Sequence, residues 1–365
     1  MNKCIYVGTL KYSPVYKSHC CAFGTACEAS GYYVKYLFNH EYKWMLSSEV
    51  KKKTVFIGQS TDVSSMVKDT LNLKNLQLIR KIFLEDSPTH FYVHNYHLLN
   101  HYIAKLAEKY DCKFIYHVHE PYTIDKKAHG GIQQYWLHLY EFFDGILIDK
   151  TDTVVLSSKT AQYLFDLRYH NFSGKKMLIP LMYEDLCNFD FNLQDRRYIT
   201  FIGPPVPAKN PEKFLEIVRY SNMIGLGLKF LLVSRKRVND PRFYNEANLE
   251  IFHKEKISDE EFGEIIKKSL AIIAPYRRET QSSVLLTSYM YGTPVVSSDV
   301  GGLPEFVHHK KTGYIVDLYA KLEEWIEGIN YILQNFPIMS RNCRKYFEEN
   351  FSGKNWNKYL DELLN

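Results

Sequence analysis

Two charged residues stand where an apolar, strand-like run gives way to a helical pattern. Lys209 follows 198-YITFIG-203, and Glu279 follows 271-AIIAPY-276 and precedes a helix expected over 283–291. A lysine in such a loop can stabilise a phosphate anion, and the amide groups of a helix N-terminus attract anions. A carboxylate nearby can accept hydroxyl groups and orient a polar substrate. Taken alone, a solvated lysine and an acidic partner of the helix dipole are the simpler explanations.

Four glycines punctuate the stretch 289-YMYGTPVVSSDVGGLPEFVHHKKTGYIVD-317. Paired glycines between two strands let the backbone bend and approach a ligand closely, which we expect of Gly301 and Gly302. We expect Gly292 to permit tight helix–strand packing and Gly313 to be a turn residue.

The rest of the chain alternates short apolar runs with longer amphipathic ones, which predicts βα units and parallel sheets. The expected strands are 4–8, 31–38, 54–58, 90–94, 113–119, 145–149, 153–158, 198–203, 229–234, 249–253, 271–276, 294–298 and 314–317. The expected helices are 18–30, 95–110, 129–143, 159–168, 211–222, 259–269 and 283–291. Ser258 and Glu261 form a predicted capping box at the start of 259–269. The alternation of apolar and amphipathic runs is interrupted over 178–197, which we interpret as a linker.

The composition is that of a globular protein long enough for two domains. Of the 365 residues, 46 are Lys or Arg and 41 are Asp or Glu, a basic excess too small to indicate nucleic-acid binding. The seven cysteines are scattered with no CxxC pair, and no Asp-x-Asp occurs, so no metal site is expected. The N-terminus lacks the layout of a signal peptide and no apolar run could span a membrane, which favours a reducing, cytoplasmic location. No GxGxxG follows a strand, and no P-loop is present.

The second half resembles the retaining family-4 glycosyltransferases. The resemblance rests on 201-FIGPPVPAKNPEKFLEIV-218, on 257-ISDEEFGEIIKKSLAIIAPYRRE-279 and on 279-ETQSSVLLTSYMYGTPVVSSDVGGLPE-305 with Thr312-Gly313 after it. It is strong over 198–317, weaker over 90–165 and weakest over 1–90.

The resemblance implies an α/β protein of GT-B fold, with two Rossmann-like domains whose parallel sheets face each other across a cleft. We expect an N-terminal, acceptor-side domain over 1–185 and a C-terminal, nucleotide-sugar-binding domain over 190–340. A C-terminal helix within 341–365 is expected to cross back to the first domain, because 346-YFEENFSGKNWNKYLDELL-364 resembles the closing helix of the family.

The resemblance also implies the functional residues. Lys209, Glu279 and His119, at the end of strand 113–119, would lie at the reaction centre, with His117 a competitor for the role of His119. The donor would be bound by Gly203, Gln281, Ser282, Ser283, Val284, Thr287, Gly301 and Gly302. Lys17 and Ser18 would belong to a loop that contacts phosphate or acceptor.

Two positions depart from the family pattern. The second glutamate of the family, which holds ribose hydroxyls, falls on Thr287, and an arginine that faces the diphosphate falls on Pro204. The glycine-rich turn after strand 229–234 is replaced by 234-SRKR-237. Arg277 and Arg278, or else Arg235, could supply the missing charge from another direction.

Two functions remain open at this point. One is a retaining glycosyltransferase that uses a UDP- or GDP-linked sugar and a glycan or lipid-linked acceptor, without a metal or another cofactor. The other is a catalytically silent homologue that binds or stabilises a partner. A phosphorylase is a distant third, because no lysine signature for a pyridoxal cofactor is present. The lysine clusters 51–53 and 126–127 permit peripheral contact with an anionic membrane face.

Overall fold

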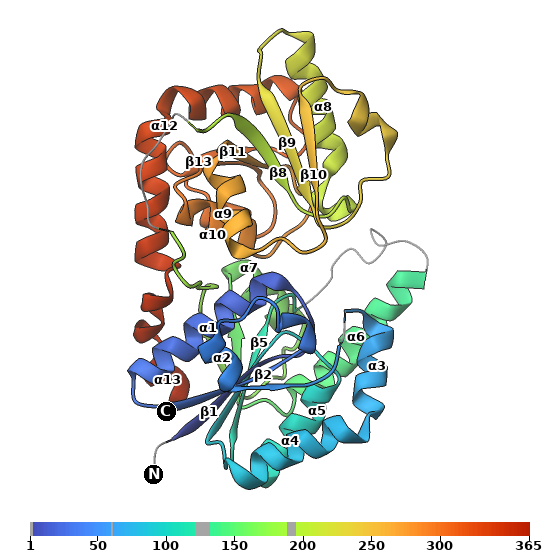
Figure 1. Ribbon diagram of the computed structural model, residues 1–365, viewed down its shortest axis with the longest axis vertical. Coiled ribbons are helices and arrows are strands. Elements are labelled where there is room, and N and C mark those ends of the chain that lie inside the picture. The colour runs from blue at the N-terminus through green and yellow to red at the C-terminus, as the bar shows by residue number, and fades with distance from the viewer. Residues whose placement is uncertain (1–2, 60, 122–131, 188–194) are drawn as a thin grey trace. The chain divides into compact units, whose positions relative to one another are not determined.

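The chain forms two compact units in the computed structural model, which describes residues 3–59, 61–121, 132–187 and 195–365 (Figure 1). The first unit comprises Met1–Glu184 and Ser352–Asn365, and the second comprises Asp185–Phe351. The expected boundary at 341 lies inside the helix α12, Leu322–Asn350. The chain therefore returns to the first unit later than expected, at Ser352.

The first unit is built on a parallel sheet of seven strands in the order β3-β2-β1-β4-β5-β6-β7. The strands are β1 Cys4–Thr9, β2 Tyr33–Phe38, β3 Thr54–Phe56, β4 His90–His94, β5 Lys113–Val118, β6 Thr153–Leu156 and β7 Lys175–Leu178. The helices are α1 Pro14–Ala29, η1 His40–Tyr42, α2 Ser48–Lys52, α3 Val63–Leu71, α4 Leu73–Glu85, α5 Leu99–Lys109, α6 Ile132–Ile148, α7 Lys159–Arg168, η5 Gly353–Lys358 and α13 Leu360–Leu364.

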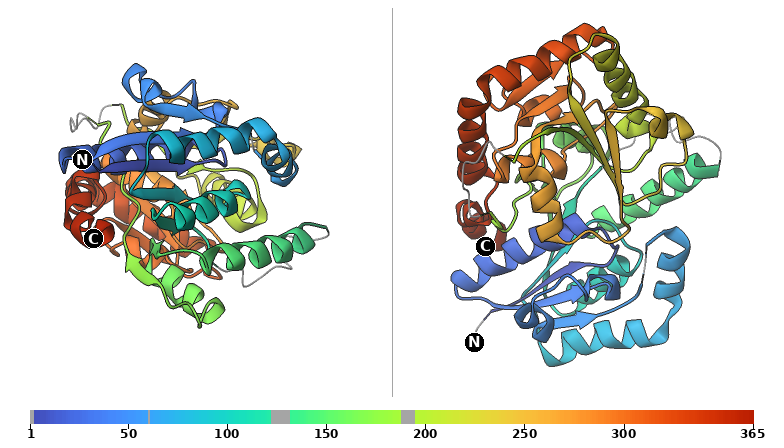
Figure 2. Two further views of the ribbon diagram at one scale, coloured as in Figure 1. Left: turned by 90° about the horizontal axis from the view of Figure 1, so that it is seen from below. Right: turned by 45° about the horizontal axis from the view of Figure 1, so that its top comes forward.

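Side chains that alternate along the strands of this sheet fill two separate cores. Ile5 and Val7 of β1 belong to the core under α1, whereas Tyr6 between them belongs to the core on the other face. The first core is completed by η5 and α13, which lie beside α1 (Figures 1 and 2). The second contains residues of α4, α5, α6 and α7. A strand's period of two therefore accounts for both layers of helices.

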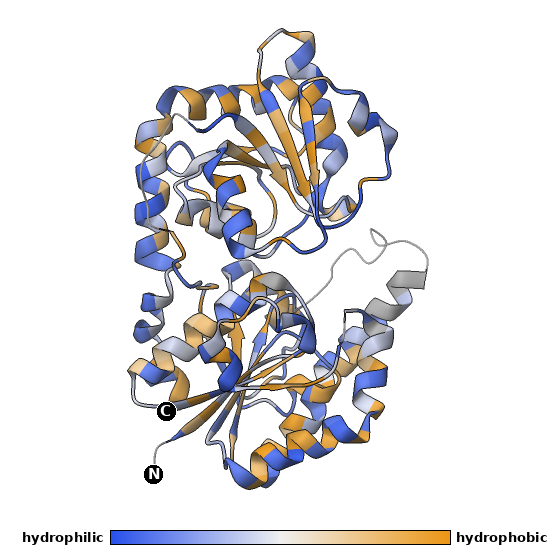
Figure 3. Ribbon diagram, viewed as in Figure 1, coloured by the Kyte–Doolittle hydropathy of each residue, from blue (hydrophilic) through white to orange (hydrophobic). Residues whose placement is uncertain are grey.

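The second unit holds a parallel sheet of six strands in the order β10-β9-β8-β11-β12-β13. The strands are β8 Tyr198–Ile202, β9 Lys229–Ser234, β10 Leu249–His253, β11 Ser269–Ala274, β12 Val295–Ser298 and β13 Gly313–Val316. Its helices are η3 Pro207–Lys209, α8 Pro211–Met223, η4 Pro241–Asn245, α9 Asp259–Lys267, α10 Ser283–Met290, α11 Leu303–Phe306 and α12. Figure 3 shows hydrophobic residues along the strands and mixed character along the helices, as burial on both faces of a parallel sheet requires.

The largest error in the expected elements concerns 145–149. This apolar run was expected to be a strand, but it is the last turn of α6, whose Leu147 and Ile148 are buried. A short apolar run looks the same at the end of a buried helix as in a strand. Expectation also missed β7, α3 and α4. In β7 only Met177 is buried, so the apolar pattern is weak there.

The capping box at the start of α9 is confirmed. The Glu261 amide donates to Ser258 Oγ over 3.2 Å, and the Ser258 amide donates to Glu261 Oε2 over 3.0 Å.

The glycines of 289–317 have different tasks from one another. Gly301 has a φ of +53°, and a Cβ on it would lie 2.1 Å from the carbonyl oxygen of Glu279. Gly292, with a φ of +65°, ends α10 in the left-handed conformation. Gly313 is in β13, where a Cβ would lie 2.3 Å from Val295 O. Gly313 is thus a packing glycine, whereas it was expected to be a turn residue.

We predict that Gly301→Ala destabilises the second unit more than Gly225→Ala does. Both positions have a positive φ, which costs an alanine about 1–3 kcal/mol. Of the two positions, only Gly301 would place the new Cβ against a backbone atom. A Cβ on Gly225 would meet no heavy atom of the described residues within 4 Å. Urea unfolding of the two variants measures the difference. Equal losses of unfolding free energy would show that the contact with Glu279 is readily relieved.

A buried carboxyl group lies inside the first unit. Asp144 of α6 is 2% exposed, and it accepts hydrogen bonds from the hydroxyls of Tyr116 (2.7 Å) and Tyr169 (3.3 Å). Burial raises the pKa of Asp144 to about 7, against the opposing effect of the two tyrosine hydrogen bonds; the charge of Glu141 adds to the rise and that of Arg168 lowers it.

We predict that the wild-type protein loses stability as the pH rises through the pKa of Asp144, and that the Asp144→Asn variant does not. Between about pH 4 and pH 7 the folded protein keeps a proton on Asp144 that the unfolded chain releases, so unfolding becomes easier as pH increases. The asparagine variant should gain stability relative to wild type by up to about 4 kcal/mol between those limits. Thermal unfolding across this range tests it, with the exposed neighbour Asp149→Asn as control. A difference that does not grow with pH would contradict the prediction.

Candidate active site

Three loops of the second unit converge because they follow adjacent parallel strands. β8, β11 and β12 are neighbours in the sheet, and parallel strands end at one edge. Lys209 follows β8, Glu279 follows β11 and Gly301 follows β12. The topology therefore brings together residues that are far apart in the sequence.

Lys209 and Glu279 form an ion pair in which Lys209 Nζ donates to Glu279 Oε2. The Glu279 side chain is 8% exposed and that of Lys209 is 21% exposed. Lys209 Nζ also lies 3.9 Å from the ring centre of Tyr276, which is fully buried. A cation over an aromatic ring is attracted by about 0.5–2 kcal/mol, so Tyr276 supports the ammonium group from the core side.

Three hydrogen bonds to backbone carbonyl groups fix the loop that carries Glu279. The Arg277 amide donates to Ala208 O over 2.9 Å, which ties the loop to η3. The Gly302 amide donates to Glu279 O over 2.9 Å, and Ser298 Oγ donates to Tyr276 O over 2.5 Å. The position of the Glu279 carboxylate is therefore set by its neighbours on β8 and β12.

The N-terminus of α10 follows Glu279 directly. Ser282 is its N-cap residue with no side-chain cap, and the first turn holds no acidic residue. Gln281 and Ser282 are buried, whereas Ser283, Val284 and Thr287 are half-buried on one face of the helix. The first amides of a helix have no partner within it and carry a partial positive charge. The arrangement can bind an anion beside the carboxylate.

The loop after β8 depends on glycine. Gly203 has a φ of +152°, and its amide donates to Val233 O over 3.0 Å. Asn210, also left-handed with a φ of 53°, then leads from η3 into α8. These turns direct Lys209 toward Glu279. Of the cations that could replace an arginine at Pro204, Arg277 is exposed, and Arg278 and Arg235 are half-buried.

In the first unit, His119 follows β5 and is half-buried. The ring of Tyr16, from α1, packs edge-on against it with centroids 5.6 Å apart, and Asn95 Nδ2 donates to the Tyr16 hydroxyl over 2.9 Å. His117 is fully buried and bonds through Nδ1 to the Tyr92 hydroxyl (2.6 Å). Of the two histidines, only His119 is exposed enough to meet a substrate.

The expectation that Lys17 and Ser18 lie in a loop is wrong, because α1 already begins at Pro14. Lys17 is 7% exposed and pairs with Glu184 (3.5 Å), whose amide donates to Ser18 Oγ (3.1 Å). The two side chains hold the end of the first unit's main segment against α1.

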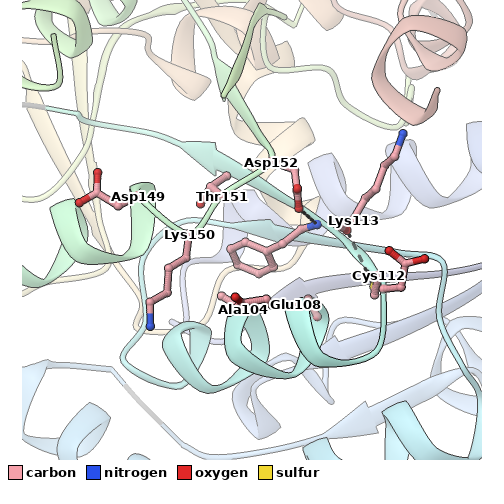
Figure 4. A pocket seen from close by; sticks show the side chains of 11 residues that line it. Ala104, Glu108, Cys112, Lys113, Asp149, Lys150, Thr151 and Asp152 are labelled. Atoms are coloured by element: carbon pink, nitrogen blue, oxygen red, sulfur yellow. Dashed lines mark hydrogen bonds between the residues drawn. The ribbon is translucent and has the colours of Figure 1, made fainter. Parts of the chain in front are cut away.

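A cavity of about 510 Å³ in the first unit contains none of the expected residues (Figure 4). It lies at the amino ends of β5 and β6, away from the edge at which His119 stands. It is lined by Ala104, Ala107, Glu108, Asp111, Cys112, Lys113, Phe114, Asp149, Lys150, Thr151 and Asp152. Asp152, one of its lining residues, has a structural role, because its Oδ2 accepts a hydrogen bond from the Phe114 amide over 2.7 Å. We do not take it as the active site.

Sequence reasoning missed the residues that support the site. Tyr276, Ser298, Tyr16 and Asn95 position its groups through a ring face, a hydroxyl or an amide. Their residue types carry no spacing signal, although Tyr276 stands close to Glu279 at the end of a strand.

Comparison with known proteins finds a family match in the part of the chain that carries Lys209 and Glu279. Residues 188–350 match the model for glycosyl transferases group 1. D-inositol 3-phosphate glycosyltransferase from Mycobacteroides abscessus is 23% identical over 239 residues, which are 60% of this chain and 52% of that protein. The enzyme of the same name from Gordonia bronchialis is 25% identical over 191 residues, 47% of this chain and 40% of that protein. The chain thus spans about half the length of these relatives, or less.

Solved structures match along the whole chain. Sucrose-phosphate synthase from Thermosynechococcus elongatus has a TM-score of 0.72 at 14% identity and covers 99% of both chains. HepE from Anabaena, solved in complex with UDP-glucose, has a TM-score of 0.71 at 11% identity and covers 100% of this chain and 99% of its own. At such identities the likeness shows the fold. Residues 188–350 are thus similar to the group 1 glycosyltransferases, and the two units have the α/β GT-B fold of these solved structures.

Proposed function

We propose that the protein transfers a sugar from a nucleoside-diphosphate sugar to an acceptor hydroxyl, with retention of the anomeric configuration. The observation that carries the proposal is the Lys209–Glu279 pair, which is held on Tyr276 beside the N-terminus of α10. It offers a cation and helix amides for a diphosphate, and a carboxylate for sugar hydroxyls, within one loop system.

The pair is set to exchange partners when a donor arrives. A diphosphate oxygen can take the place of the Glu279 carboxylate on Lys209, because both are anionic acceptors of its ammonium group. Glu279 is then released to accept hydrogen bonds from the sugar. Lys209 and the amides of α10 would stabilise the charge that grows on the leaving diphosphate. Tyr276 keeps the ammonium group in place during the exchange.

In the transfer step, the bond between the anomeric carbon and the phosphate oxygen breaks, and a bond to the acceptor oxygen forms on the same face of the sugar. The acceptor proton goes to the departing phosphate oxygen, so no separate carboxylate base is invoked. We propose that the step needs no metal or other cofactor, since the chain's own cations and amides meet the charge. His119 is proposed to contact the donor sugar near the reacting carbon.

The donor is proposed to be UDP- or GDP-linked. Support for the class comes from HepE, which was solved with UDP and with UDP-glucose. The acceptor is proposed to be a hydroxyl of a glycan or of a lipid-linked sugar, at the cytoplasmic face of a membrane. Lys51 and Lys52 end α2, whereas Lys126 and Lys127 lie outside the described residues.

No described helix combines the length and the apolar character that crossing a bilayer requires.

A catalytically silent partner protein is the second candidate, favoured by Thr287 and Pro204. Thr287 stands half-buried on the accessible face of α10, but its single hydroxyl cannot clamp two ribose hydroxyls as a carboxylate can. The same assays separate the two functions, because a silent homologue would turn over no donor.

We predict that Lys209→Met and Glu279→Gln each lower the transfer rate by about 100-fold or more, as expected when a group that stabilises the transition state is lost. A panel of UDP-, GDP- and ADP-sugars, followed by calorimetry and diphosphate release, supplies the substrate. Lys267→Met is the matched control, because Lys267 also pairs with a glutamate, Glu264 (3.0 Å), and lies over a tyrosine ring, that of Tyr291. It ends α9, before the amino end of β11. Undiminished turnover in both site variants would contradict the roles proposed for Lys209 and Glu279.

We predict that at least one of Arg235→Ala, Arg277→Ala and Arg278→Ala weakens UDP binding by about tenfold, equivalent to roughly 1.4 kcal/mol. These arginines stand at the carboxyl ends of β9 and β11, on either side of the loop that holds Pro204. The affected variant should also bind with less dependence on salt. Arg242→Ala, whose guanidinium pairs with Asp240, serves as the control. Unchanged UDP affinity in all three would mean that no arginine replaces the missing cation.

A further inference from the structure

Three histidines of the first unit meet in its interior. His19 comes from α1, His94 ends β4 and His117 lies in β5, and each is at most 1% exposed. Their ring centroids are 4.7 to 4.9 Å apart. One ring nitrogen from each lies within 4.8 Å of the other two.

Several of these nitrogens have no hydrogen-bond partner among the residues that the structure describes. Both ring nitrogens of His94 and Nε2 of His117 are buried and unpaired. A buried polar atom without a partner costs about 1–3 kcal/mol, so native proteins keep few of them. A neutral imidazole has one N–H and one lone pair, so His94 and His117 can each present one unpaired lone pair to a ligand.

The hydrogen bonds that do exist orient the rings for such a ligand. His117 Nδ1 bonds to the Tyr92 hydroxyl over 2.6 Å, which leaves Nε2 facing the cluster. His19 Nδ1 lies 3.0 Å from Met182 O and 3.2 Å from the Met182 amide nitrogen. A metal-binding histidine commonly uses its second nitrogen in this way, on a carbonyl or another oxygen, which fixes the tautomer. The contact of His19 Nε2 with the Tyr92 hydroxyl (2.8 Å) would be exchanged for the ion.

We propose that His19, His94 and His117 bind a zinc ion. Imidazole nitrogens suit zinc and its neighbours among the transition metals, whereas magnesium and calcium require oxygen ligands. With zinc–nitrogen bonds of about 2.0–2.1 Å, nitrogens in a tetrahedral site lie roughly 3.3 Å apart, so the three rings close on the ion by modest rotations. A water completes the four ligands, and its deprotonation on zinc reduces the buried positive charge.

The proposed site is structural, and it supports the edge of the sheet from which His119 projects. Tyr16 packs edge-on against His94 with centroids 4.5 Å apart and, at 5.6 Å, against His119. An ion that locks His94 would therefore hold Tyr16, and through it the wall beside His119. The proposal does not depend on the transferase function, because it concerns metal content and folding stability.

This inference departs from the expectation that the chain has no metal site. That expectation rested on missing CxxC and Asp-x-Asp patterns. The three histidines come from one helix and two strands, and only the order of the strands in the sheet brings them together. They therefore form no short sequence pattern that a search for metal-binding motifs could find.

The first test is the metal content of the full-length protein, purified from zinc-supplemented cells and measured by plasma mass spectrometry. The proposal expects about one zinc per chain, its loss on chelation, and a rise in melting temperature when Zn²⁺ is returned. Titration of the metal-free protein with Co²⁺ should give the visible absorption of a tetrahedral nitrogen site. A protein that purifies without zinc and binds neither ion would overturn the proposal.

Variants then locate the ion. His94→Leu should abolish zinc and cobalt binding while leaving the metal-free protein at least as stable as wild type, because it removes two unpaired nitrogens. His90→Gln is the matched control: His90 is also buried in β4, but its nitrogens bond to Thr89 and to Leu364 O, so metal binding should persist. Full metal binding in the His94 variant would refute the assigned ligands. Wild-type metal content decides the question even if that variant does not fold.

Discussion

The ion pair between Lys209 and Glu279 is the interaction on which the candidate site depends. A buried pair gains stability only when its geometry is good and further contacts satisfy both partners, since removing either charge from water is costly. Here Tyr276 supports the ammonium group, and hydrogen bonds to Ala208 O and from the Gly302 amide fix the loop that carries the carboxylate. These neighbours offset the cost of burying the pair, and in the proposed exchange they would stay in place when an anion replaces the carboxylate. A site that is already ordered loses less entropy when it binds.

The backbone around the pair is under an equally strict constraint. Gly301 must be glycine because the carbonyl of Glu279 occupies the space that a side chain would need, at a φ that L-residues avoid. Gly203 faces the same conformational demand after β8. Gly301 therefore marks where the loops after β11 and β12 approach each other, and the loop after β11 carries Glu279 of the ion pair. The spacing of the glycines and the positions of the two charged residues in the sequence both reflect the same packing of loops at the end of the second sheet.

These constraints explain which features could be predicted from the sequence. The repeating strand and helix patterns, the family resemblance and the residues Lys209 and Glu279 depend on local pattern, which the sequence contains. The end of α6 was misassigned because burial makes helix and strand alike over a few apolar residues. Lys17 and Ser18 were misplaced because α1 begins earlier than its apolar run. Tyr276, Tyr16 and the histidine cluster needed the fold, because their contacts join elements that are distant in sequence.

The candidate residues of the two units differ in the charge around them. In the second, the expected donor-binding residues are arranged around a cation, a carboxylate and helix amides, which are groups that recognise phosphate and hydroxyl. In the first, the candidate His119 is backed by Tyr16, His94 and other rings rather than by an ion pair. Without the proposed zinc ion, a wall of rings offers shape and hydrogen bonds but little charge of its own. Under the proposed function, the groups of the second unit would set the affinity for the diphosphate. Rigid rings such as Tyr16 hold a neighbouring side chain in one orientation, and a misplacement of about 1 Å can cost a reaction about 100-fold in rate.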